Sequence, residues 1–103
     1  MSNVETFGSI IKGETPVLVD FFAEWCGPCK MMPPILEQVH NQLGDKVRII
    51  KIDVDRNQQL AAQLNVSSVP TLAIFHKGEI KWRQPGVQSA NALVQLLSQH
   101  MPQ

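Results

Sequence analysis

Two cysteines are the residues of this 103-residue chain whose type and spacing could do chemistry. They stand in the segment Cys26-Gly27-Pro28-Cys29. Two thiols at this spacing can reduce a disulfide in two steps: one thiolate attacks the substrate to form a mixed disulfide, and the other then attacks that bond and releases the reduced product. We interpret the pair as a redox-active dithiol that closes to a disulfide when it is oxidised.

Three other interpretations of the pair stay open from the motif alone. A purely structural disulfide would stabilise the folded state little, because closing so short a loop removes little entropy from the unfolded chain. A structural zinc site would lack two ligands, since His40, His76 and His100 are scattered along the sequence. Two unrelated buried thiols would have no reason to be separated by Gly-Pro. We therefore expect no metal.

Asp20 is the second informative residue, because it lies in the otherwise apolar run Val17–Phe22. Poor hydration there should raise the pKa of its carboxyl group. We predict that Asp20 accepts the proton of Cys29 when that thiol attacks; the alternative is a strand-end acid that accepts backbone hydrogen bonds. Lys51 interrupts a second apolar run and could face Asp20 across neighbouring strands, tuning its pKa. It could equally be a lysine whose stem packs while its ammonium group reaches water.

The elements that must position these residues follow from the apolar pattern. The runs over 17–22 and 47–54 consist largely of apolar residues, which predicts two strands that are buried on both faces. Pro33 and Pro34 lie inside the longest helical pattern and should kink it. In chain order the pattern predicts a helix over 3–12, a strand over 17–22, a helix over 28–43, a strand over 47–54, a helix over 57–64, strands over 71–76 and 79–84, and a helix over 89–99.

Strands that alternate with helices imply an α/β domain with a parallel core, and the closing hairpin adds an antiparallel edge. One such domain fits residues 1–103. Cys26 then falls between the carboxyl end of a central strand and the first turn of the next helix. Unpaired backbone N–H groups at a helix start favour a thiolate. We expect Cys26 to be exposed with a lowered pKa, and Cys29 to be more buried and to remain a thiol.

Composition excludes several other functions. Nine basic residues balance nine acidic ones, so the chain lacks the positive surplus that a nucleic-acid-binding protein uses. No apolar run is long enough to cross a membrane. The first residues show no secretory signal, which predicts a cytoplasmic protein. Asp53–Asn57 begins like a calcium loop, but the later positions do not fit, so we interpret it as a strand end followed by a helix cap.

The segment Trp25-Cys26-Gly27-Pro28-Cys29-Lys30, preceded by Val19-Asp20-Phe21 and followed by Val69-Pro70-Thr71, resembles the thioredoxin family along nearly the whole chain. The resemblance implies a thioredoxin fold, in which one central mixed sheet of four to five strands is flanked by helices on both faces. Only Met1 to about Val4 could supply the family's first edge strand, so that strand should be short or missing. Phe22 stands where many thioredoxins carry tryptophan.

The resemblance also implies site residues beyond the cysteines. Pro70 should follow a cis peptide bond opposite the reactive cysteine, which leaves the backbone groups of Val69 free to pair with an extended substrate. Gly86 should let the substrate approach closely. Trp25 should form a flat apolar surface beside Cys26, although a lone tryptophan is often a core residue. The pair Gly27-Pro28 is typical of the reducing members and tunes the thiols.

The function implied is that of a protein-disulfide reductase and electron carrier. Its substrates would be disulfide-containing client proteins, and a flavin-dependent thioredoxin reductase would reduce it again. The chain itself would carry no cofactor and act as a monomer, without nucleic acid or membrane. Two rivals remain: an oxidase or isomerase with the same chemistry, and a binding module whose thiols are idle.

Overall fold

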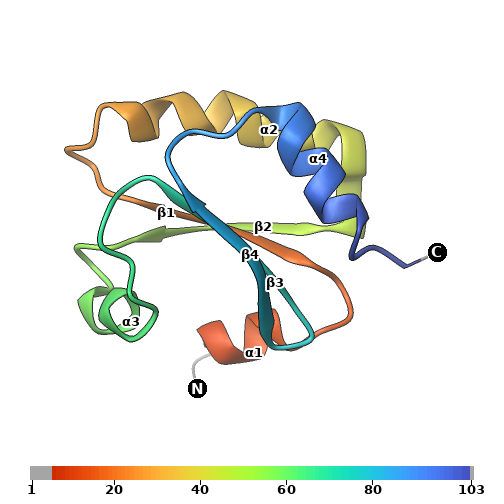
Figure 1. Ribbon diagram of the computed structural model, residues 1–103, viewed down its shortest axis with the longest axis horizontal. Helices are drawn as coiled ribbons and strands as arrows, with labels where there is room; N and C mark the ends of the chain where they lie inside the picture. Colours follow the sequence, from red (N-terminus) through yellow and green to blue (C-terminus); the bar gives the residue numbers. More distant parts are fainter. Residues whose placement is uncertain (1–5, 103) are drawn as a thin grey trace, which may run out of the picture.

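The computed structural model describes residues 6–102 and places a four-stranded mixed sheet between two layers of helices (Figure 1). The strands lie in the order β2-β1-β3-β4. β1 pairs in parallel with β2 and antiparallel with β3, and β3 pairs antiparallel with β4. Their bounds are Val17–Phe22 for β1, Arg48–Asp53 for β2, Thr71–His76 for β3 and Glu79–Pro85 for β4.

Helices cover both faces of this sheet, with α2 and α4 on one face and α1 and α3 on the other (Figure 1). The α-helices are α1 (Phe7–Ile11), α2 (Met32–Leu43), α3 (Gln58–Gln63) and α4 (Ala90–Ser98). Two short 3-10 helices flank α2, η1 over Pro28–Met31 and η2 over Gly44–Lys46. The element order and the mixed sheet confirm the predicted α/β architecture.

The alternation of side chains along β1 divides the core into two clusters. Leu18 packs with Met32 of α2 and Leu93 of α4, whereas Val19 packs on the other face with Phe75 of β3. Because neighbouring residues of a strand point to opposite faces, Asp20 shares the face of Leu18. β1 is buried along almost its whole length, as predicted.

The prediction that the second strand is buried on both faces is wrong. Within residues 6–102, β2 lies at the edge of the sheet, and its residues are only partly buried or exposed. Edge strands have a neighbour on one side only, so an apolar sequence does not ensure burial there. The segment proposed for an N-terminal edge strand lies outside the described residues.

Two details of the helices also differ from expectation. Pro33 and Pro34 lie in the first turn of α2, where a missing N–H group costs nothing, so they do not kink its interior. The irregularity lies before them, where η1 changes to α2. The first helix begins after Thr6, whose side chain accepts a hydrogen bond from the Ser9 N–H at 3.1 Å. The predicted caps at Ser2 and Asn3 lie outside the described residues.

Candidate active site

Cys26 and Cys29 are joined by a disulfide at the point where the chain leaves β1 and enters η1. Their Cα atoms lie 5.4 Å apart. The backbone N–H of Cys29 donates a hydrogen bond to the Sγ of Cys26 at 3.2 Å. The start of η1 therefore directs a backbone N–H group toward the Sγ of Cys26. This is the arrangement that we expected for a cysteine placed between a strand end and a helix start.

Both cysteines are buried, which corrects the expectation that Cys26 is exposed. The exposed fraction is 3% for Cys26 and 6% for Cys29, so the expectation that Cys29 is the more buried of the two is also wrong. The two residues form a small apolar cluster with Ala23, against which Phe22, Val54 and Val69 pack. The Sγ of Cys26 also lies 3.6 Å from the carbonyl oxygen of Val69. The loop before β3 thus covers a sulfur that the sequence pattern placed at the surface.

Asp20 is fully buried, and among the described residues neither of its carboxylate oxygens has a hydrogen-bond partner. Burial raises the pKa of Asp20 from 3.8 to about 6, while the positive charge of Lys51 acts in the opposite direction. Lys51 lies opposite Asp20 in the parallel register of β1 and β2. The alternative of a strand-end acid that accepts backbone hydrogen bonds does not match this environment.

Phe22 positions Lys51 in a way that the sequence did not reveal. The Nζ atom of Lys51 lies 5.0 Å from the centre of the Phe22 ring, within the range of a cation–π interaction. Lys51 is exposed, so its ammonium group also reaches water as the alternative interpretation proposed. Both interpretations of Lys51 therefore hold in part.

Trp25 is exposed to 72%, which excludes the alternative that it is a core residue. Its indole Nε1–H donates a hydrogen bond to the Oδ2 of Asp55 at 2.8 Å. Asp55 lies in the turn after β2, where the Oδ1 of Asp53 accepts hydrogen bonds from the N–H groups of Asp55 and Arg56. The strand-end interpretation of this segment is confirmed, and the structure adds a role for Asp55 as the anchor of the indole.

A shallow cavity of about 130 Å³ lies beside Trp25 and is lined by apolar and hydroxyl-bearing side chains. Val69 forms part of its wall, and the peptide bond between Val69 and Pro70 is cis. The carbonyl oxygen of Pro70 accepts a hydrogen bond from the N–H of Gly86 at 2.8 Å. The remaining lining residues are Val54, Val66, Ser67 and Ser68.

The two glycines of the site, Gly86 and Gly27, differ in backbone conformation. Gly86 has a φ of +93°, a conformation that side chains with a Cβ rarely adopt, and no atom lies within 4 Å of where its Cβ would be. Gly27 has a φ of −60° and is equally open. Pro28 is the first residue of η1, a position where its ring is well tolerated. Gly27 and Pro28 are both exposed next to the disulfide.

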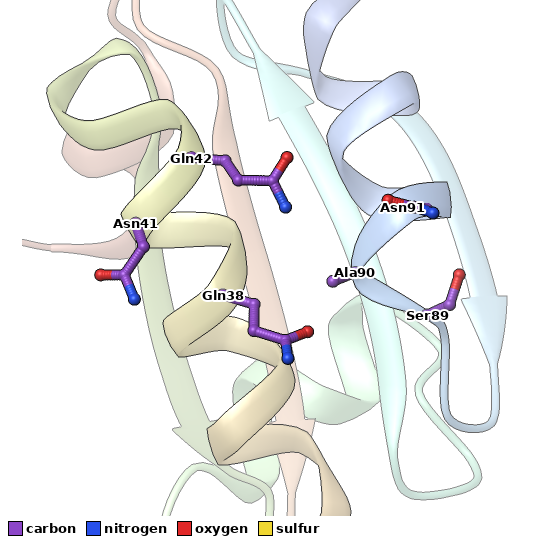
Figure 2. Close-up of a pocket in the computed structure, with 6 residues that line it drawn as sticks. All are labelled: Gln38, Asn41, Gln42, Ser89, Ala90 and Asn91. Atoms are coloured by element: carbon purple, nitrogen blue, oxygen red, sulfur yellow. The ribbon is translucent and has the colours of Figure 1, made fainter.

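Other features of residues 6–102 do not contribute to this site. No group of three or more His, Cys, Asp and Glu side chains in that range is arranged to hold a metal. None of the helices described there is long and apolar enough to span a membrane. A groove of about 490 Å³ between α2 and α4 contains amide side chains, among which Gln38 and Gln42 point toward α4 (Figure 2). Its lining includes no cysteine.

A disulfide of the CxxC type at the end of a central strand and the start of a helix is the arrangement of a thiol–disulfide oxidoreductase. The thioredoxin family model matches residues 1–99. The chain is 46% identical to the thioredoxin of Bacillus subtilis over 88 residues, which is 85% of each chain. It is 47% identical to a thioredoxin-like protein of Synechocystis over 92 residues, or 88% of each. The chain belongs to the thioredoxin family.

Solved structures agree with this assignment. A mutant thioredoxin from Halobacterium salinarum superimposes with a TM-score of 0.83 at 36% identity, covering 97% of this chain and 89% of that one. Mitochondrial thioredoxin 3 from Saccharomyces cerevisiae, in its oxidised form, gives 0.80 at 33% identity, covering 90% and 86%. The thioredoxin fold is confirmed, and the chain is a disulfide reductase that acts on disulfide-containing substrates.

Proposed function

We propose that Cys26 is the attacking thiolate and Cys29 the resolving thiol. In the reduced protein, the Cys26 thiolate attacks one sulfur of a client disulfide, and the other client sulfur leaves and takes up a proton. Cys29 then loses its proton and attacks the Sγ of Cys26, which releases the second client thiol. Two electrons pass to the client, and the chain ends as the Cys26–Cys29 disulfide that the structure contains.

The single observation that carries this order is the hydrogen bond from the Cys29 N–H to the Sγ of Cys26. A donor aimed at a sulfur atom stabilises negative charge on it, and here the donor is a backbone group that needs no rearrangement. No comparable donor reaches the Sγ of Cys29 within residues 6–102. Cys26 is therefore the better thiolate of the pair.

Asp20 is proposed as the acceptor of the Cys29 proton. With a pKa of about 6, its carboxyl group can take up and release a proton near neutral pH. Among the described residues its oxygens have no hydrogen-bond partner, so both can accept a proton. Lys51 tunes the group, because its positive charge keeps part of the Asp20 population ionised.

The client is proposed to bind over Trp25, the Val69–Pro70 segment and Gly86. Trp25 offers an exposed apolar face, and Val69 borders the cavity next to it. The open space at Gly86 admits a second backbone. An extended segment of the client could then pair with the backbone of Val69 while its disulfide meets Cys26. Gly27 and Pro28 border the same surface and set the local environment of the thiols.

The reaction runs in the direction of disulfide reduction, and we propose a flavin-dependent thioredoxin reductase as the electron donor. Gly27 and Pro28 between the cysteines support this direction, because oxidising relatives usually carry histidine before the second cysteine. A disulfide reductant is of use where thiols are kept reduced, so we propose the cytoplasm as its compartment. Monomeric action stays a prediction.

Trapping of the mixed disulfide tests these roles. When the reduced Cys29→Ser variant is mixed with a peptide disulfide, we expect a stable adduct on Cys26, because nothing can resolve it. Mass spectrometry of the intact protein should show the added mass of one peptide half. The Cys26→Ser variant is the matched control and should form much less adduct. Equal trapping by both variants would contradict the assignment.

A further inference from the structure

Two of the three histidines, scattered in the sequence, meet at the end of the sheet away from the disulfide. β3 begins beside Pro70 and ends at His76, and His100 follows α4. The centres of the two imidazole rings lie 5.8 Å apart, with the ring planes inclined at 54°. Both histidines line a cavity of about 300 Å³ together with Met101, which also packs against the core under α2 and α4.

The hydrogen bond of His76 leaves one ring nitrogen available as a ligand. The Nε2 of His76 lies 2.8 Å from the carbonyl oxygen of Glu14. A carbonyl only accepts, so Nε2 carries the proton and Nδ1 retains its lone pair. A ring N–H donated to a backbone carbonyl is the usual support of a metal-binding histidine, because it fixes the tautomer and orients the ring.

We propose that His76, His100 and Met101 form a binding site for a copper(I) ion. An ion about 2.0 Å from a nitrogen of each ring lies about 3.1–3.2 Å from each ring centre. Two centres 5.8 Å apart then correspond to an N–metal–N angle of about 130–140°. That angle suits the low coordination number of copper(I), whereas tetrahedral zinc would bring the centres to about 5.2 Å.

The third donor and the local charge also favour copper(I). Thioethers are soft ligands that select this ion over zinc, and Met101 is the soft donor on the cavity wall. The carboxylate of Glu14 lies 3.7 Å from Lys77, and that of Glu79 lies 2.8 Å from Lys81. Both carboxylates are thus paired with lysines and are not available as ligands. The two lysines repel a monovalent cation less than a divalent one.

His100 and Met101 are consecutive residues after α4, and His76 ends β3, so two short segments supply the three proposed ligands. This site shares no residue with the disulfide site, so its failure would not affect the proposed reductase mechanism.

Competition with a copper(I) chelator tests the proposal. The full chain is kept oxidised, so that no thiolate can bind the metal, and is titrated without oxygen against copper(I) bicinchoninate with ascorbate present. We expect the protein to withdraw one copper(I) per chain. His76→Asn and His100→Asn should each weaken binding at least tenfold, and Met101→Leu several-fold. His40→Asn, which changes the third histidine on α2, should bind like the parent.

Ring NMR signals of the unmodified protein give an independent measurement should a variant fail to fold. Copper(I) should shift the signals of His76 and His100 and leave those of His40 unchanged. The proposal is overturned if no copper(I) is withdrawn or if the two histidine variants bind like the parent. Tighter binding of Zn²⁺ than of copper(I), unaffected by Met101→Leu, would also overturn it.

Discussion

Asp20 is held inside the protein without a hydrogen-bond partner among the described residues, and this has a consequence for stability. Burial raises the pKa of its carboxyl group from 3.8 to about 6. Below pH 3.8 the group is protonated in both the folded and the unfolded chain, so burial of a charge costs nothing. Above pH 6 it is ionised in both, and the folded state is the one that is penalised. The free energy of unfolding therefore falls as pH rises from about 4 to 6.

Replacing Asp20 by asparagine should remove this penalty. We expect Asp20→Asn to be about 2–3 kcal/mol more stable than the parent at pH 8, since each pKa unit corresponds to about 1.4 kcal/mol. At pH 3 the two proteins should be equally stable. Urea unfolding of the oxidised chains at both pH values measures the difference. The same variant should release a mixed disulfide more slowly, because the acceptor of the Cys29 proton is gone.

Lys51→Met provides the complementary variant. Removing the positive charge should raise the pKa of Asp20 further, so the loss of stability should extend to higher pH than in the parent. Methionine keeps an unbranched apolar side chain of similar length at this position, without the charge that lies over the Phe22 ring. An Asp20→Asn chain whose stability advantage is the same at pH 3 and pH 8 would show that the carboxyl group is not the cause.

At the scale of elements, the sequence predicts a strand, helix or turn well where its determinants lie within a few neighbouring residues. The strand Val17–Phe22 forms as expected from its apolar residues, and the hairpin around Lys77-Gly78 forms as expected from the turn preference of this pair. The edge position of β2 could not be predicted in this way. It depends on which strands are neighbours, although β2, with three charged residues against one in β1, already differs from the central strand in its sequence.

The same reasoning separates the predictable from the unpredictable parts of the site. Spacing alone indicated Cys26 and Cys29, and the break in an apolar run indicated Asp20. The burial of Cys26 under Val69 and the bond between Trp25 and Asp55 join distant segments, so no local pattern contains them. The meeting of His76 and His100 is likewise a product of the tertiary fold.

The turn after β4 gives an element-scale prediction. Gly86→Ala should destabilise the protein by about 1 kcal/mol or more, because a residue with a Cβ is strained at a φ of +93°. Gly27→Ala is the matched control, because Gly27 has equally open surroundings but a helical φ of −60°. It should be neutral or stabilising by up to about 1 kcal/mol. Urea unfolding measures both, and equal effects would contradict the conformational explanation.

At the scale of the whole molecule, the same sheet contributes side chains to a hydrophobic core on each of its two faces. The cluster under α2 and α4 includes Leu97, and the cluster under α1 includes Phe75. The two are separated by the backbone of the sheet, yet β1 and β3 contribute side chains to both. Loss of packing on either face should therefore weaken the same strands, and the described residues should unfold as one cooperative unit.

Truncation of one residue in each core tests this cooperativity. Leu97→Ala should cost about 2–5 kcal/mol and Phe75→Ala about 3–5 kcal/mol, because both side chains are almost fully buried. Ile80→Ala, at an exposed position of β4, should cost less than about 0.5 kcal/mol. In each variant, far-ultraviolet circular dichroism and tryptophan fluorescence should report one coincident urea transition. If Phe75→Ala unfolds the two signals at different urea concentrations, then the faces are separate units and the sheet does not couple them.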